Sequence, residues 1–439
     1  MRTLPPQTDP VTLLQRLVQF DTTNPPGNEA VCIAYIADLL RGAGVEPTTI
    51  ARDPARPNLI ARLEGRGDAP PLLMYGHIDV VTAEGQSWRH PPFAGEVHES
   101  FLWGRGTLDM KGGVAMMLAA FLRTIDEGTS LPGDVILAVL SDEEAGSDVG
   151  ARFLVEEHAH LFDGVKYAIG EFGGFTMHIG GRPFYPIMVS EKQICWMQAK
   201  VRGRGGHGSM PVHGEAMSRL ADALAKLDRI RLPVHVTPPV KLMFGAIADE
   251  LGGITGGLIK LMLRPALTDV ILGLMGDKGA LFDPLLHNTV SPTMLVASDK
   301  VNVIPSEVTL GLDGRLVPGQ RPGDLVAELH AILGPHIDLD VIRADDPPPD
   351  PDLRLFGTLS EIIRAGDPAG VPVPLVLSGT TDGRYFAKLG IQTYGFLPMK
   401  LPKDFNFSST IHGVDERVPV EAVRFGADAI HSLLQRTHD

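Results

Sequence analysis

Cysteine is scarce in this sequence, with only Cys32 and Cys195 among 439 residues. Two thiols so far apart imply no disulfide framework, so a reducing interior compartment is the default expectation. The opening residues, MRTLPPQTDP, lack the apolar core of a signal peptide. We therefore expect a cytoplasmic protein.

Long uncharged apolar runs and basic runs are missing too. The most apolar stretch, residues 251–275, carries Lys260, Arg264 and Asp269 in its middle, and charges there are costly in lipid. We expect an apolar helical insert packed on protein, and no membrane partner. A formal charge of −14 without any Lys/Arg-rich run argues against a nucleic-acid partner.

The motifs of nucleophile enzymes are also absent. The sequence contains no G-x-S-x-G elbow, and neither cysteine has a convincing histidine context, so we set aside a Ser or Cys nucleophile. Hydrophobic residues make up 44% and charged residues 21% of the chain, which is ordinary for a soluble globular protein.

Strand-like and helix-like segments alternate through the first part of the chain. The strand candidates are residues 58–63, 72–75, 135–140 and 165–169, and the helix candidates are residues 10–20, 28–41, 114–125 and 148–158. This alternation predicts an α/β fold with a mostly parallel central sheet and helices on both faces.

The pattern changes after about residue 180 and returns near the C-terminus. Strands near 192–202, 308–312 and 337–342 and helices near 214–230 and 322–333 predict an α+β unit, interrupted by apolar, Gly-rich sequence. The linker DDPPPDPD is stiff and polar, as a domain crossing should be. The expected domains are residues 1–188 and 347–439, forming one domain in two parts, and an inserted domain over 189–346 with an extra insert at about 235–289.

Adjacent carboxylates follow one of the strand candidates. Glu143 and Glu144 come after residues 135–140, and His77 and Glu171 also sit just past predicted strands. In open α/β sheets, functional residues gather beyond the carboxyl ends of the strands. Two neighbouring carboxylates there are tolerable beside a cation. Taken alone, such a pair would more often be a solvated acidic loop.

The chemistry of these side chains favours metal. The candidate ligands are His77, Asp109, Glu144, Glu171 and His412. Imidazole and carboxylates without paired thiolates suit zinc, cobalt or manganese. Any one of them alone would more often be structural, but the set exceeds what one open catalytic zinc needs, so two ions sharing a carboxylate are expected. Asp79 is placed to accept the other imidazole N–H of His77, and Glu143 is free to take a proton from a water on the ions.

Several blocks resemble the signatures of a known family. They are GHIDVV, GRGTLDMKGG, SDEEAGS, the strand ending at Gly170-Glu171, and HGVDE from His412. In this order they resemble a metallopeptidase and amidohydrolase family that includes acetylornithine deacetylase, succinyl-diaminopimelate desuccinylase, aminoacylase and glutamate carboxypeptidase. The resemblance covers nearly the whole chain.

The resemblance implies a role for each residue of the site. Asp109 would bridge two zinc ions, and the peptide bond after it would be cis. The remaining ligands would be His77 and Glu171 at one ion, and Glu144 and His412 at the other. Glu143 would be the general base, and then the acid for the leaving amine. The inserted domain would be a lid and dimerisation domain.

The resemblance also reaches the lid. His207 in GGHGSMP would enter the active site of a partner subunit in a homodimer and steady the oxyanion. Asn302, Arg315, Gly379 and Thr380 would contact the substrate. Arg315 could clamp a carboxylate or form an ordinary salt bridge on its strand. The long insert could enlarge the dimer interface or wall the substrate cleft.

We therefore expect a dinuclear-metal hydrolase of amide or peptide bonds in N-acyl amino acids or small peptides. Deacylase, dipeptidase and carboxypeptidase share these motifs, and the sequence does not separate them. The alternative is a catalytically inactive relative that binds amino-acid-like ligands, against which the intact ligand set and the retained Glu143 argue.

Overall fold

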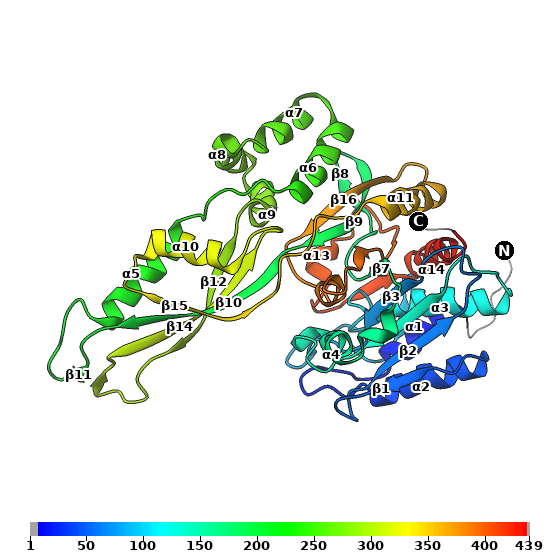
Figure 1. Ribbon diagram of the computed structural model, residues 1–439, viewed down its shortest axis with the longest axis horizontal. Coiled ribbons are helices and arrows are strands. Elements are labelled where there is room, and N and C mark those ends of the chain that lie inside the picture. The colour runs from blue at the N-terminus through cyan, green and yellow to red at the C-terminus, as the bar shows by residue number, and fades with distance from the viewer. Residues whose placement is uncertain (1–7, 437–439) are drawn as a thin grey trace. The chain divides into compact units, whose positions relative to one another are not determined.

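The chain forms two compact units in the computed structural model, which describes residues 8–436. Unit 1 runs to Val189 and resumes over Pro351–Leu375 and from Thr381, and unit 2 comprises Ser190–Asp350 and Val376–Thr380. Figure 1 shows the elements of both. Among the described helices, none has both the length and the apolar character needed to cross a bilayer.

The segment Val376–Thr380 departs from the expected division, which places it in the second part of the main domain. It groups with unit 2 because its polar groups bond there. The Lys192 backbone N–H donates to the Leu377 carbonyl at 3.0 Å, and the Arg315 side chain donates to the Thr380 hydroxyl.

Unit 1 is built on one large sheet. In spatial order its strands are β1 (Thr48–Ile50), β2 (Asn58–Leu63), β6 (Val135–Leu140), β3 (Leu72–His77), β7 (Tyr167–Gly170), β17 (Gln392–Gly395), β9 (Arg182–Glu191) and β16 (Val371–Leu377), with β8 (Met177–Ile179) paired to β9. The central strands β6, β3, β7 and β17 pair in parallel. The predicted parallel centre is thus confirmed, whereas β1, β2 and β9 add antiparallel margins.

Successive side chains of the central strands point to opposite faces, which explains their unbroken apolar sequences. Leu137 and Val139 of β6 join one hydrophobic cluster, and Ile136 and Ala138 join another. The helices of the first cluster are α1 (Pro10–Val18), α2 (Ala30–Gly42), α3 (Lys111–Asp126), α11 (Arg354–Gly366) and α14 (Val420–Leu434). Those of the second are α4 (Ala151–Glu157) and α12 (Gly383–Ala387). Helices therefore cover both faces, as predicted.

A small antiparallel sheet also belongs to unit 1. Its strands are β18 (Arg417–Pro419), β5 (Phe101–Trp103) and β4 (Glu96–His98), with β5 in the middle. The pairing of β18 with β5 brings the C-terminal segment beside residues that lie far earlier in the sequence.

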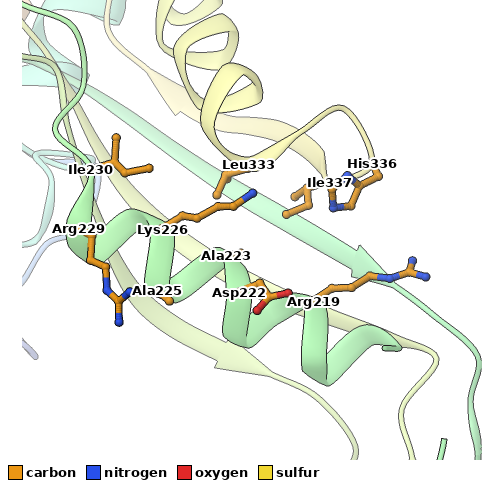
Figure 2. Close-up of a pocket in the computed structure, with 10 residues that line it drawn as sticks. All are labelled: Arg219, Asp222, Ala223, Ala225, Lys226, Arg229, Ile230, Leu333, His336 and Ile337. Atoms are coloured by element: carbon orange, nitrogen blue, oxygen red, sulfur yellow. The ribbon is translucent and has the colours of Figure 1, made fainter. Parts of the chain in front are cut away.

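Unit 2 contains an antiparallel sheet in the order β12 (Thr289–Val296), β14 (Glu307–Leu316), β10 (Gln193–Arg202) and β15 (Asp338–Ala344). Its hydrophobic core joins this sheet to helices α5 (Ala216–Arg229) and α10 (Pro322–Leu333). A separate ribbon pairs β11 (Gly206–His207) with β13 (Val303–Ile304). A surface pocket of about 390 Å³ lies beside α5 and the end of α10, with Arg219, Lys226, Arg229 and His336 among its lining (Figure 2).

The apolar insert is helical, as predicted. It comprises α6 (Pro238–Leu251), α7 (Gly253–Met262), α8 (Pro265–Met275) and α9 (Asp277–Leu286). These helices bury Phe244 and Met262 completely. Their other side is open, because Ile254 and Leu274 are 85% and 79% exposed. The insert therefore packs on protein through one side, as expected, while its other side exposes apolar side chains to solvent.

Candidate active site

The predicted strand-end residues share one edge of the central sheet. His77 is the last residue of β3, Glu143 and Glu144 lie in the 3-10 turn Glu143–Ala145 after β6, and Glu171 follows β7. Because β6, β3 and β7 are parallel neighbours, their carboxyl ends lie side by side at the same edge of the sheet. The turn leaves the strand through Asp142, which has a left-handed backbone conformation with a φ of 71°. Asp tolerates this conformation better than most residues do.

Asp109 lies between two histidines. Its Oδ1 is 3.1 Å from His77 Nε2, and its Oδ2 is 3.0 Å from His412 Nε2. Glu144 Oε1 lies 3.2 Å from the same His412 nitrogen. Asp109 lies two residues before α3, and the Asp109–Met110 peptide bond is cis, as the resemblance implies.

Further carboxylates approach His77. The Oε2 atoms of Glu143 and of Glu171 are each 3.9 Å from His77 Nε2. The ligand atoms of His77, Asp109 and Glu144 lie within 4.8 Å of one another, and so do those of His77, Glu143 and Glu171. The structure therefore brings all the predicted metal-ligating residues, together with Glu143, into one cluster.

Asp79 organises the loops around this cluster. Its Oδ1 accepts the backbone N–H of Glu143 at 3.1 Å, and its Oδ2 accepts that of Glu144 at 3.1 Å and the Asn24 amide at 2.8 Å. His77 Nδ1 lies 3.0 Å from the Asp79 carbonyl and 3.4 Å from its Oδ1. The nearest partner of this imidazole nitrogen is thus the backbone oxygen of Asp79. The Asp79 carboxylate, which we expected to accept the imidazole N–H of His77, mainly accepts the backbone N–H groups of Glu143 and Glu144.

Sequence reasoning missed several supporting residues. Asn24 bonds both Asp79 and Asp142, and Arg56 pairs with Asp142 from 2.8 Å. Asp382 is buried and accepts a hydrogen bond from the Ser147 hydroxyl. Asp382 lies close to Gly379 and Thr380, for which the resemblance implies substrate contacts, but no local pattern marks Asp382 itself.

A buried ion pair fixes the segment that carries His412. Glu416 accepts from Arg105 at 2.6 Å and from the backbone N–H of Leu108 at 2.8 Å. Arg105 also donates to the His412 carbonyl at 3.1 Å. Because Leu108 precedes Asp109, this ion pair sets the position of His412 relative to Asp109.

The electrostatics of the cluster show an excess of buried acid. Burial raises the pKa of Glu143 and of Glu171 well above the usual range, and burial raises the pKa of Asp382 to about 6. Burial alone would lower the pKa of His77, but Asp109 and Asp79 raise it well above its usual value. Asp109 and then Glu144 raise the pKa of His412 to about 10.

This cluster fits divalent cations. Glu171 Oε2 is buried and has no hydrogen-bond partner among the residues that the structure describes. Imidazole nitrogens and carboxylate oxygens without thiolates are the donor set of zinc, cobalt or manganese in hydrolases. Positive charge here would offset the burial, and the repulsion between neighbouring carboxylates, that raise the pKa values of Glu143 and Glu171.

The predicted lid residues lie in unit 2. His207 is exposed on β11 and Asn302 is exposed in the turn just before β13, and the Gly208 N–H donates to the Asn302 carbonyl at 2.8 Å. Ser209 donates to His207 Nδ1 through its backbone N–H at 3.2 Å. Nδ1 is therefore the acceptor, and the proton of a neutral ring resides on Nε2.

Arg315 has an acidic neighbour on its own strand. Its Nε and Nη2 donate to Asp313 at 2.8 and 3.2 Å, and its Nη1 donates to the Thr380 hydroxyl at 3.3 Å. This geometry is the ordinary salt bridge that sequence reasoning left open. Gly379 and Thr380 are half-buried in the segment that Arg315 holds.

Known proteins resemble most of the chain. The N-fatty-acyl-amino acid synthase/hydrolase PM20D1 of Mus musculus is 27% identical, over 83% of this chain and 74% of that protein. The succinyl-diaminopimelate desuccinylase of Hydrogenovibrio crunogenus is 26% identical, over 93% of this chain and 94% of that protein.

A solved structure shows the same fold. It is the M20 family metallo-carboxypeptidase Sso-CP2 from Sulfolobus solfataricus, with a TM-score of 0.70, 17% identity and coverage of 97% of this chain and 98% of that one. The cluster described above lies within residues 73–436, over which the chain matches peptidase family M20/M25/M40. The predicted strand-end residues lie in one cluster, and the family match covers most of this chain. The chain belongs to peptidase family M20/M25/M40.

Proposed function

We propose that this protein is a dinuclear-metal hydrolase of amide or peptide bonds, acting on N-acyl amino acids or small peptides. The observation that carries the proposal is the placement of Asp109, whose two oxygens face different histidines at 3.1 and 3.0 Å. A carboxylate in this position can serve two ions at once. Family membership supports the reaction class.

The ligands divide between the two sides of Asp109. His77 and Glu171 would hold one ion, and Glu144 and His412 the other. Zn²⁺ is the first candidate, with Co²⁺ or Mn²⁺ as alternatives of the same donor preference. When bound, such ions acidify a water toward neutrality and polarise the substrate carbonyl.

Glu143 is the proposed proton carrier. It is the acid next to Glu144 in the turn, and its Oε2 lies 3.9 Å from His77 Nε2. Its carboxylate would take a proton from the attacking water and then give it to the leaving nitrogen. Asp79 is a positioning residue, because it holds the backbone N–H of Glu143 and so fixes where this proton transfer takes place.

The lid supplies the remaining proposed groups. His207, with its proton on Nε2, is a donor suited to steady an oxyanion, and it would do so in the active site of a partner subunit of a homodimer. Asn302, Gly379 and Thr380 would contact the substrate. Because Arg315 is paired with Asp313, we propose that it orders Thr380, and that a substrate carboxylate would share its guanidinium.

The names of the relatives suggest the acyl classes to test. We would count bound metal and then assay N-acetyl, N-succinyl and N-fatty-acyl amino acids against dipeptides, with Zn²⁺, Co²⁺ or Mn²⁺ added. Hydrolysis of at least one class, with about two ions bound per chain, is expected. A protein that holds both ions and hydrolyses no member of the panel would be the inactive ligand-binding relative instead.

A further inference from the structure

A second group of potential metal ligands lies outside the candidate active site, in unit 1. Glu96 and His98 are on β4, and since side chains two positions apart on a strand share a face, both point the same way. His90 comes from the loop before the strand. None of these residues belongs to the Asp109 cluster.

The donor atoms of this group converge. Glu96 Oε2 lies 2.9 Å from His98 Nε2 and 3.4 Å from His90 Nδ1. All three ligand atoms lie within 4.8 Å of one another. A zinc ion needs about 2.0–2.2 Å to each nitrogen or oxygen, so small side-chain rotations would place one ion between them.

The histidine rings are held in place by their neighbours. The His90 and His98 rings stack at 4.0 Å between centroids, and the His90 ring lies 4.7 Å from that of Trp103. Trp103 is buried on the central strand β5, opposite Glu96. This packing lowers the rotamer entropy that the ligands would lose on binding an ion.

We propose that His90, Glu96 and His98 form a binding site for a divalent transition-metal ion such as Zn²⁺, separate from the Asp109 cluster. Two imidazoles and one carboxylate form the same ligand set that holds zinc in some hydrolases, with positions left for water. The soft nitrogen donors favour Zn²⁺, Ni²⁺ or Cu²⁺ over Mg²⁺ or Ca²⁺. An ion here would tie the loop that carries His90 to β4.

The test uses the holoenzyme with its active site already loaded with Zn²⁺. Equilibrium dialysis against Zn²⁺, with elemental analysis, should show one further equivalent per chain. In His98→Asn and in Glu96→Gln, the affinity for that equivalent should fall about 10–100-fold or more, since loss of a direct ligand should cost at least as much as loss of an outer partner. His178→Asn, on the exposed strand β8, should bind like wild type.

A second readout locates the ion. Added Ni²⁺ should quench the fluorescence of Trp103, and the quenching should be weak in His98→Asn and absent in a Trp103→Phe protein. Absence of the further equivalent in wild type, or equal affinity in wild type, His98→Asn and Glu96→Gln, would overturn the proposal. Both substituted ligands are exposed, so these variants are expected to fold.

Discussion

The Asp79 carboxylate accepts the backbone N–H of Glu143 at 3.1 Å, so the proposed proton carrier is positioned by a side chain from the adjacent strand end. In Asp79→Asn one oxygen becomes an amide that faces an N–H donor, and the turn must shift. We expect kcat to fall about 10–100-fold, as for lost supporting partners of metal sites. Circular dichroism and metal content should be measured with the kinetics, and Asp21→Asn, on an exposed loop, is the control.

Glu143→Gln removes the proposed proton carrier and keeps its shape. We expect kcat to fall by about 10²–10⁴-fold, the usual contribution of general acid–base catalysis. Elemental analysis should still find both ions, because the other ligands remain. A variant with wild-type turnover would show that another group moves the proton.

Glu144→Gln should act on the metal. Glu144 Oε1 is 3.2 Å from His412 Nε2, and a neutral amide is a poor substitute for an anionic ligand. Dialysis against a weak chelator, followed by elemental analysis, should remove metal from this variant at concentrations that spare wild type. Added Zn²⁺ should restore part of the activity, and full metal retention would contradict the assignment.

Asp382 makes stability depend on pH. Its folded-state pKa is about 6, against an ordinary value of 3.8, so between these values the folded state binds more protons than the unfolded state. Stability therefore falls as pH rises through this window, by up to about 3 kcal/mol for a fully buried group. Asp382→Asn still accepts from Ser147 and removes the buried charge.

This prediction is measured on the metal-free protein, because bound cations would stabilise the charged carboxylate. Urea unfolding should find Asp382→Asn more stable than wild type at pH 7.5. The difference should shrink toward zero at pH 4, where wild-type Asp382 is protonated. A stability difference between Asp382→Asn and wild type that does not change with pH would mean that burial does not raise the pKa of Asp382.

Lys192 connects the helical insert to the antiparallel sheet of unit 2 through hydrogen bonds. Its ammonium donates to the Pro284 carbonyl at 2.8 Å, the His287 carbonyl at 3.0 Å and the Thr289 hydroxyl at 3.0 Å. In Lys192→Met one buried and two part-buried acceptors lose their donor, which should destabilise unit 2 by roughly 2–4 kcal/mol. Lys200→Met, which loses one exposed pair with Asp340, should leave the urea midpoint close to that of wild type, because solvent screens exposed ion pairs.

Much of the site was predictable because parallel strands align their ends. His77, Glu143, Glu144 and Glu171 each follow a strongly apolar run, and sequence periodicity finds such runs easily. The antiparallel margins were not predictable in this way. β9 contains two prolines and β16 another two, and their pairing depends on tertiary contacts without a local signal.

The position of His412 was also beyond local sequence patterns. It depends on the pairing of β18 with β5 and on the buried hydrogen bond that Arg105 donates to Glu416. Nothing near either residue specifies a partner about three hundred positions away, so residue type made His412 a candidate and the family resemblance implied its place beside Glu144. Asp382 was missed for a similar reason, since its bond to Ser147 spans distant segments.

The long-range bond between Glu416 and Arg105 has a consequence during translation. A ribosome adds His412 and Glu416 about three hundred residues after Arg105. Until they dock, Arg105 lacks its carboxylate partner and the Asp109 loop lacks its clamp. A nascent chain that ends before His412 therefore cannot complete the proposed hydrolytic centre, since both its side chain and the Glu416–Arg105 contact are still missing.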